Sequence, residues 1–233
     1  MERSLKERFK KRFTAIFKTA IDMTAHILTP AESYSAPARL NFADDESRHD
    51  WLPALLDLYY ITDQGVHEGI RREERKGRKL ACFKGCSACC RAHTTIPVYP
   101  IEITGLYWYM IEKTEGQLRQ KLRQQCSRHQ AGNPCPLLVD GACGVHLLRP
   151  QACRHFNVFR FPCAEGEDAY YTRREDVLTP LKKFKDDAMS KMLPFHKING
   201  RSQRREAIKS GLLHQYAKVL QELDWPKLAQ RMI

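Results

Sequence analysis

No long apolar run occurs in the 233 residues of this chain. Its first 28 residues read MERSLKERFKKRFTAIFKTAIDMTAHIL, and lysines and arginines interrupt the apolar positions throughout. A secretion signal needs a continuous apolar stretch, and a membrane-spanning helix needs about eighteen apolar residues. We therefore expect neither feature, and we expect the protein to work in the reducing cytoplasm.

The familiar catalytic motifs are missing as well. The sequence contains no GxGxxG, no P-loop, no HExxH and no GxSxG. Glu102, Asp140 and Glu165 have no evident acid–base partner nearby in the sequence. No catalytic residue is predicted, and whether the protein is an enzyme stays open.

Acidic residues are in deficit. The chain has 39 Lys and Arg against 27 Asp and Glu, which gives a formal net charge of +12. Such a balance favours an acidic partner, which would be a nucleic acid, an anionic membrane surface or an acidic protein. The alternative is that the surplus charge only keeps the protein soluble, and metal-bound thiolates would offset part of it.

Strand-like alternation is rare, whereas apolar residues recur at helical spacings of three and four. The predicted helices cover residues 3–28, 50–76, 101–113, 116–129, 176–192, 201–222 and 225–232. Asp50 is the predicted N-cap of the second helix, and Gly77 its stop. The expected fold is mainly α, with helices packed around an irregular cysteine-rich segment at 131–165.

Two regions are expected along the chain. Residues 1–48 would hold a basic amphipathic helix and a connector, and residues 49–233 a single helical domain with a cysteine-cluster core at 80–165. In the first helix, Phe9, Phe13 and Phe17 share one face, and lysines and arginines occupy the other. We expect these rings to pack against the domain, while docking of the helix on an anionic membrane is the alternative.

Nine cysteines are what the sequence has in abundance. In a reducing compartment, clustered cysteines bind metal more often than they form disulfides. Vicinal Cys89 and Cys90 could join each other only through a strained ring. Cys126 falls on a predicted helix and is expected to be an ordinary thiol. The predicted metal ligands are Cys82, Cys86, Cys89, Cys90, Cys135, Cys143, Cys153 and Cys163.

The order of these cysteines resembles a known family. SACCRAH is followed by Cys135-Pro, by Cys143-x-Val-His and by Arg149-Pro-x2-Cys153-Arg. This series is similar to the YkgJ-like cysteine-cluster family, the CxxCxxCC proteins described as zinc- or iron-chelating and related to flagellin lysine N-methylases. The resemblance covers roughly residues 80–163.

The resemblance implies particular residues. It implicates Cys86, Cys89 and Cys90 in the first motif and Cys135, Cys143 and Cys153 in the second, and it matches Arg149 and Arg154 to the family's arginines. Two departures are present. Three residues separate Cys82 from Cys86 where the family has two, and His146 stands where tyrosine is common, so His146 is not expected to be a ligand.

The metal itself is open between two choices. Eight thiolates suit two tetrahedral zinc sites, or one [4Fe–4S] cluster with four cysteines in other roles. Zinc favours paired short knuckles, and only Cys86-x2-Cys89 is one, so the scattered later cysteines favour an iron–sulfur cluster. Arg149 and Arg154 are predicted to neutralise such an anionic cluster. His93 or His155 could replace one thiolate.

One more enzyme class shares part of this spacing. Cys82-x3-Cys86-x2-Cys89 also occurs in radical S-adenosylmethionine enzymes, but Ala88 stands where those proteins usually have an aromatic residue, and no alternating strands are predicted. The first hypothesis is therefore a cytoplasmic metal-binding protein with a structural, redox or metal-handling role. A lysine N-methyltransferase-like enzyme is the alternative, and an adaptor for nucleic acid or membrane surfaces is the third.

Overall fold

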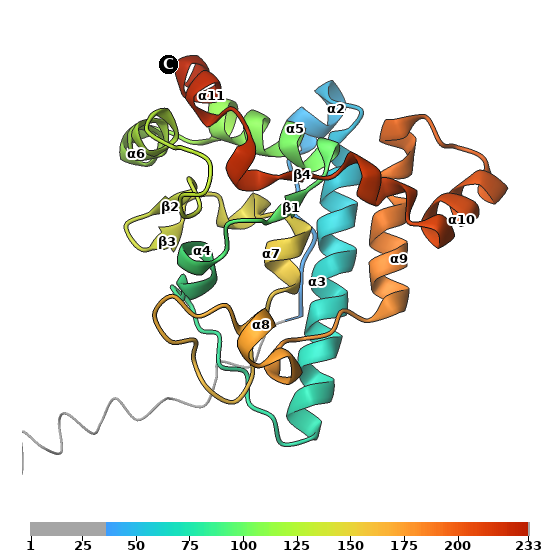
Figure 1. The fold of residues 1–233 in the computed structure, drawn as a ribbon. Coiled ribbons are helices and arrows are strands. Elements are labelled where there is room, and N and C mark those ends of the chain that lie inside the picture. The colour runs from blue at the N-terminus through green and yellow to red at the C-terminus, as the bar shows by residue number, and fades with distance from the viewer. Residues whose placement is uncertain (1–35, 233) are drawn as a thin grey trace, which may run out of the picture. The chain divides into compact units, whose positions relative to one another are not determined.

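The computed structural model describes residues 36–232. All of them except Ala36 fall in the larger of two compact units of the chain, Pro37–Ile233. This part is mainly α, as the sequence predicts (Figure 1). The predicted helix at 3–28, with Phe9, Phe13 and Phe17, lies outside the described residues. The helices are α2 (Ala43–Arg48), α3 (Leu52–Arg75), α4 (Ala88–Ala92), α5 (Pro100–Trp108), α6 (Gly116–Ser127), α7 (Gln151–His155), α8 (Ala169–Thr172), α9 (Lys182–Ser190), α10 (Arg201–Ser210) and α11 (Trp225–Arg231).

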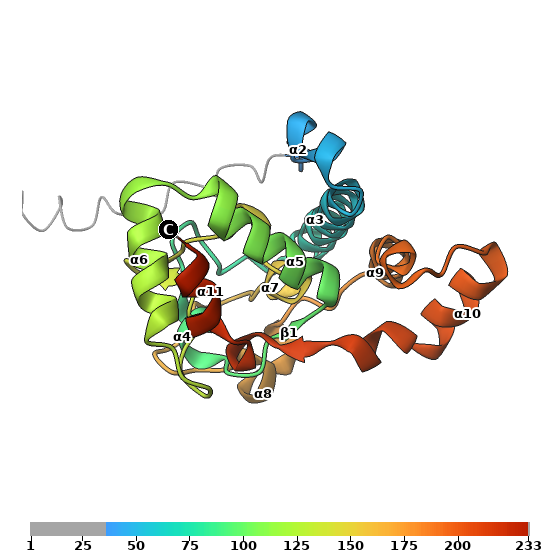
Figure 2. The ribbon, with the colours of Figure 1, turned by 90° about the horizontal axis from the view of Figure 1, so that it is seen from above.

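The long helix α3 carries the first hydrophobic core. Its apolar stripe is buried as the periodicity predicts, and α9 packs along it in both views (Figures 1 and 2). Gly65 permits the close approach, since a Cβ there would lie 2.5 Å from the Cβ of Phe184. The predicted N-cap is wrong by one residue, because Trp51 takes that position without a side-chain bond, whereas Gly77 ends the helix with φ of +82°.

A second core joins α5, α6 and α11, which lie together in Figure 2. Trp225 of α11, Leu122 of α6 and Leu106 of α5 are fully buried in it. The backbone of α5 continues without a break as one π-helical turn, Tyr109–Lys113, so the predicted helix ends at the expected residue. This core forms one wall of the cysteine-rich region.

Two of the predicted helices differ from the structure. The helix expected over 201–222 ends at Ser210, because Gly211 adopts φ of +69°, and the chain continues as a 3-10 turn. Strand β4 (Lys218–Val219) then pairs antiparallel with β1 (Pro97–Val98), Pro97 lying opposite Val219. The helix expected from residue 176 begins at Lys182, because Val177 forms a β-bridge with Val158 instead.

The start of the domain is also more regular than expected. The predicted connector contains α2, whose first turn holds three acidic residues and whose last turn holds Arg48, an arrangement that complements the helix dipole. Leu40 and Phe42 pack against the first core. Across residues 36–232, none of the helices combines the length and the apolar character that crossing a membrane requires.

The cysteine-rich segment packs among the helices, as the sequence predicts, and it contributes residues to both cores. It contains the hairpin of β2 (Leu138–Val139) and β3 (Ala142–Cys143), whose turn residues Asp140 and Gly141 have φ of 50° and 78°. Leu148 belongs to the first core, and Leu137 and Val145 belong to the second. Burial on both sides therefore fixes a segment that has little regular structure of its own.

Candidate metal centre

All nine cysteines lie in the described part of the chain as free thiols. The eight predicted ligands come from the loop after α3, from α4, from the turn before β2, from β3, from α7 and from the loop before α8. Figure 1 shows α4, the hairpin, α7 and α8 grouped beside α3. The fold thus collects ligands from segments up to 81 residues apart in the sequence, from Cys82 to Cys163.

Cys82 and Cys163 form the nucleus of one group of thiols. Both pack against the small apolar cluster of Val158, Ala169 and Val177. The backbone N–H of Val158 donates to Cys82 Sγ at 3.3 Å, and the guanidinium of Arg173 donates to Cys163 Sγ at 3.7 Å. Both sulfurs therefore already accept hydrogen bonds of the kind that stabilise a thiolate.

The thiols of this first group influence one another electrostatically. Burial raises the pKa of Cys82 to about 11, and repulsion from Cys86, Cys89 and Cys163 adds to the rise. Burial also raises the pKa of Cys163, with Arg173 opposing the shift and Cys86 and Cys89 reinforcing it. The first group therefore consists of four thiols that are close enough for a negative charge on one to raise the pKa of another: Cys82, Cys86, Cys89 and Cys163.

A second group of thiols lies against the core of Trp225. Cys135 is buried in that core, and Cys90, Cys143 and Cys153 pack against it. Burial raises the pKa of Cys135 to about 12, with the N–H of Leu137 opposing the rise. Burial raises the pKa of Cys153 well above its ordinary value, and repulsion from Cys135 and Cys143 raises it further.

Helix α4 connects the two groups. The sulfurs of its adjacent residues Cys89 and Cys90 interact directly, and this hydrogen bond is the largest cause of a raised pKa at Cys89, followed by burial. Cys89 also repels members of both groups, including Cys82 and Cys153. α4 therefore lies at the boundary between the groups.

The donor set suits a thiophilic metal. Burial makes every raised thiol hard to ionise alone, and a bound cation would supply the missing positive charge. The spacing is informative too. Sulfurs around one tetrahedral ion with bonds of about 2.3 Å lie roughly 3.8 Å apart. Within residues 36–232, no three thiol sulfurs lie within 4.8 Å of one another; the one such set of side chains is Asp45, His49 and Glu112.

The two predicted arginines lie beside the second group. Both lower the pKa of Cys143, against the larger effect of burial. Arg154 is only 3 % exposed, and its guanidinium pairs with Asp63 and lies 4.0 Å from the ring centroid of Tyr59. It also donates to the carbonyl of Arg149 at 2.9 Å. The structure thus places Arg154 in a buried polar network that borders the thiols.

Glu102 is the residue that sequence reasoning left without a role. It is 0 % exposed, and its carboxylate accepts the N–H of Tyr99 at 3.0 Å and the N–H of Gln151 at 2.6 Å. Gln151 is the first residue of α7, which presents Cys153. The signal available in the sequence was a glutamate three residues after the helix cap at Tyr99.

The three histidines near the motifs have other surroundings. His93 Nε2 lies 3.1 Å from Asp168 Oδ1, and its ring meets Phe156 edge-on. Burial lowers the pKa of His155 to about 4, with Lys185 adding to the effect. Burial, followed by the charge of Arg149, lowers the pKa of His146 to about 4.

Cys126, the cysteine predicted to be an ordinary thiol, is buried on α6, where burial alone raises its pKa to about 12.

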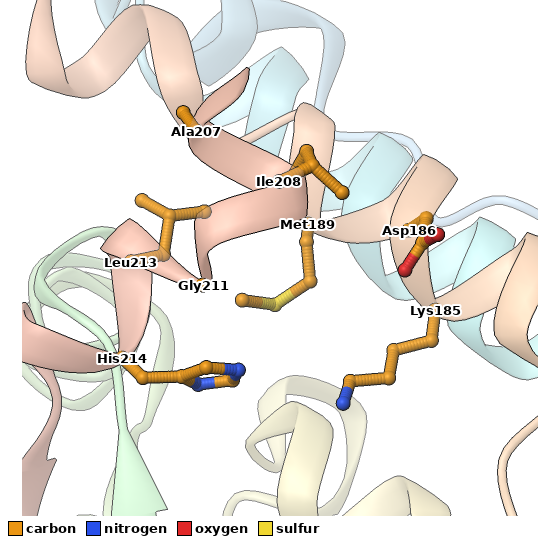
Figure 3. Close-up of a pocket in the computed structure, with 8 residues that line it drawn as sticks. All are labelled: Lys185, Asp186, Met189, Ala207, Ile208, Gly211, Leu213 and His214. Carbon is orange, nitrogen blue, oxygen red and sulfur yellow. The ribbon is translucent and has the colours of Figure 1, made fainter. Parts of the chain in front are cut away.

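A small pocket lies between α9 and α10, and none of its lining residues is a cysteine (Figure 3). Its volume is about 50 Å³, far below the roughly 300–1,000 Å³ of sites that hold drug-sized ligands. Lys185 and His214 border it, and His214 Nδ1 lies 2.7 Å from the hydroxyl of Tyr99. It plays no part in the thiol geometry.

Comparison with known proteins agrees with this geometry. The family model "CxxCxxCC: Putative zinc- or iron-chelating domain" matches residues 81–192, which include all eight clustered cysteines. Searches of curated proteins and of solved structures gave no significant match. Just under half of the chain, residues 81–192, thus matches the CxxCxxCC family of domains, described as putative zinc- or iron-chelating domains.

Proposed function

We propose that this is a cytoplasmic metal-binding protein whose cysteines hold iron as an iron–sulfur cluster of the [4Fe–4S] type. The observation that carries the proposal is the convergence of eight thiols from separate segments on the two sides of α4. The match of residues 81–192 to the chelating family supports the metal-binding part. Zinc is the alternative metal.

The spacing of the cysteines favours a cluster over a single ion. Zinc sites typically use pairs of short CxxC knuckles, and Cys86-x2-Cys89 is the one clear knuckle among the eight cysteines. A cubane cluster is larger, so its ligands lie farther apart and can arrive from scattered loops. Buried surroundings and N–H donors such as that of Val158 stabilise the sulfurs of a cluster.

A structural contribution follows from where the ligands sit. The thiols come from segments that have little regular structure and that pack between two helical cores. Because the ligand arrangement exists only in the folded chain, the free energy of metal binding stabilises the fold. A redox or metal-handling role would add to this structural one, and the surplus of basic residues would then face an acidic partner.

Anaerobic purification tests the proposal. Iron, zinc and acid-labile sulfide are measured in the full chain, together with its visible spectrum before and after dithionite. We expect brown protein with iron and sulfide in equal amounts and a spectrum that bleaches on reduction. Colourless protein with stoichiometric zinc after growth in iron-replete medium would mean that the bound metal is zinc and not iron. Metal-free folded protein would contradict the proposal as a whole.

A further inference from the structure

We propose that the eight cysteines form two separate centres. The inner centre consists of Cys90, Cys135, Cys143 and Cys153, and the outer centre of Cys82, Cys86, Cys89 and Cys163. This inference rests on the proposed function, because it states which thiols share a metal ion or cluster.

Packing defines the inner centre. Cys90, Cys135, Cys143 and Cys153 belong to the same hydrophobic core, and the N–H of Cys135 donates to the carbonyl of Cys90 at 3.0 Å. Several residues that flank these cysteines are buried, namely Pro136, Leu137, Gln151 and Arg154. Cys135 is itself buried, so this group is anchored in the core.

Two exposed loops define the outer centre. Cys82 and Cys163 pack against a cluster that is distinct from the core of the inner centre. A β-bridge between Leu80 and Phe159 holds the two loops side by side, and the N–H of Ala81 donates to the carbonyl of Val158 at 2.8 Å.

The surroundings of the outer thiols differ sharply from those of the inner thiols. Phe83, next to Cys82, is 65 % exposed, and Phe161, two residues before Cys163, is 70 % exposed. Lys84 and Gly85, which lead to Cys86, are exposed as well. Exposed residues therefore flank Cys82, Cys86 and Cys163 in their loops.

The vicinal pair on α4 assigns one thiol to each centre. The sulfurs of Cys89 and Cys90 interact directly, so this pair lies where the two groups of thiols adjoin. Cys90 packs against the inner core, and we assign Cys89, which also lies near Cys82 and Cys163, to the outer group. Each centre then has four thiolates, the number that a tetrahedral ion or a [4Fe–4S] cluster requires.

The two centres should differ in how readily they release metal. Three of the outer thiols, Cys82, Cys86 and Cys163, sit in loops with exposed residues, whereas the inner thiols pack against the core of Trp225, which must open before a chelator can surround them. We therefore assign a structural role to the inner centre and exchange or redox chemistry to the outer one.

The first test compares metal content among full-length variants purified without oxygen. The double variant Cys82→Ser/Cys163→Ser should keep about half of the metal of the unmodified chain and melt cooperatively. Cys126→Ser, a buried thiol outside both centres, should keep all of it. Loss of all metal in the outer double variant would mean one shared centre, and full retention would remove Cys82 and Cys163 from the ligands; either result overturns the partition.

The second test needs no variant. The unmodified, metal-loaded chain is mixed with excess EDTA under argon, and metal release is followed over time. Two phases of about equal amplitude are expected, and the fast phase should be missing in the outer double variant. Release in a single phase overturns the partition while leaving the proposed function intact. An unmodified chain that is purified without metal overturns both.

Discussion

The backbone N–H of Cys135 donates a hydrogen bond to the carbonyl of Cys90, with 3.0 Å between nitrogen and oxygen. This bond ties the CC pair of α4 to the first cysteine of the second motif, 45 residues later in the sequence. Both residues also pack in the core of Trp225. The two cysteine motifs are therefore packed together as parts of one structure.

Removing one thiol from either motif should lower the amount of metal bound to the protein. We expect Cys89→Ser and Cys153→Ser each to lower the metal content of purified protein, because serine is a poor ligand for thiophilic metals. Both should also lower the melting temperature, since metal binding stabilises the fold. Elemental analysis and thermal melting check this, with Cys126→Ser as the matched control. Equal metal content in all three proteins would remove Cys89 and Cys153 from the ligands.

Local sequence signals were sufficient for the helices with strong periodicity. The stripe of α3 and the stop at Gly77 could be predicted because both depend on nearby residues. The helix expected over 201–222 failed, since the pairing of Lys218 with Val98 depends on a strand 120 residues away. The glycine at position 211 was a local signal for the break, because glycine readily adopts the positive φ found there. The periodic apolar pattern on both sides of it favoured a continuous helix.

The candidate site likewise has some features that nearby residues determine and others that depend on contacts between distant parts of the sequence. Candidate ligands can be predicted from residue type and spacing, and the range matched by the family model, residues 81–192, contains all eight of them. Which thiols lie together does not follow, because it depends on how Val158 pairs with Ala81 and on which core receives Cys90. Glu102 had no visible partner for a similar reason, since its key contact is the backbone N–H of Gln151.

Gly65 is the position where α3 and α9 are most sensitive to added volume. A Cβ at residue 65 would lie 2.5 Å and 2.9 Å from Cβ and Cγ of Phe184, which is too close without movement of the helices. We expect Gly65→Ala to lower the free energy of unfolding by about 1–3 kcal/mol, as overpacked cores do. Urea unfolding followed by circular dichroism measures the change.

Gly200→Ala is the control for this prediction. A Cβ there would meet only the end of the flexible Gln203 side chain, at 3.0 Å. Its cost should stay below about 1 kcal/mol, which is the usual size of an N-cap effect when alanine replaces a favoured N-cap residue. Equal unfolding free energies for the two variants would mean that α3 and α9 do not pack as closely as described.

Substitution of Arg154 by lysine tests whether this residue positions the structure around the thiols or only neutralises their charge. Its guanidinium pairs with Asp63, stacks on Tyr59 and donates to the carbonyl of Arg149. A lysine keeps the charge but lacks the planar fork that makes these contacts together. We expect Arg154→Lys to lose about 2 kcal/mol or more of unfolding free energy, of the order found when a buried charged partner is left incompletely bonded.

Metal content gives the second readout for Arg154. If this residue positions α7, Arg154→Lys should bind metal less tightly than the unmodified chain, because Cys153 lies on the same helix. If charge alone matters, Arg154→Lys should match the unmodified chain in both metal affinity and stability. Arg71→Lys, on the exposed part of α3, controls for the substitution itself.

The buried carboxyl of Glu102 should make stability depend on pH. Burial raises its pKa from 4.5 to about 7, against the opposing effect of the Gln151 and Tyr99 N–H groups. Between pH 4.5 and 7, the folded chain therefore holds a proton that the unfolded chain has released. Since the folded state binds more protons, the free energy of unfolding contributed by Glu102 falls as pH rises, by up to about 3 kcal/mol across this window.

Comparison with Glu102→Gln isolates this contribution. His155, whose pKa is lowered to about 4, changes stability in the opposite direction between pH 4 and 6.5, because its neutral form is favoured on folding. That effect is common to both proteins and cancels in their difference. We expect the unfolding free energy of the unmodified chain, measured relative to Glu102→Gln in urea, to decline steadily from pH 4.5 to 7. Parallel pH profiles for the two proteins would show that Glu102 keeps the same charge in the folded and unfolded chains across that range.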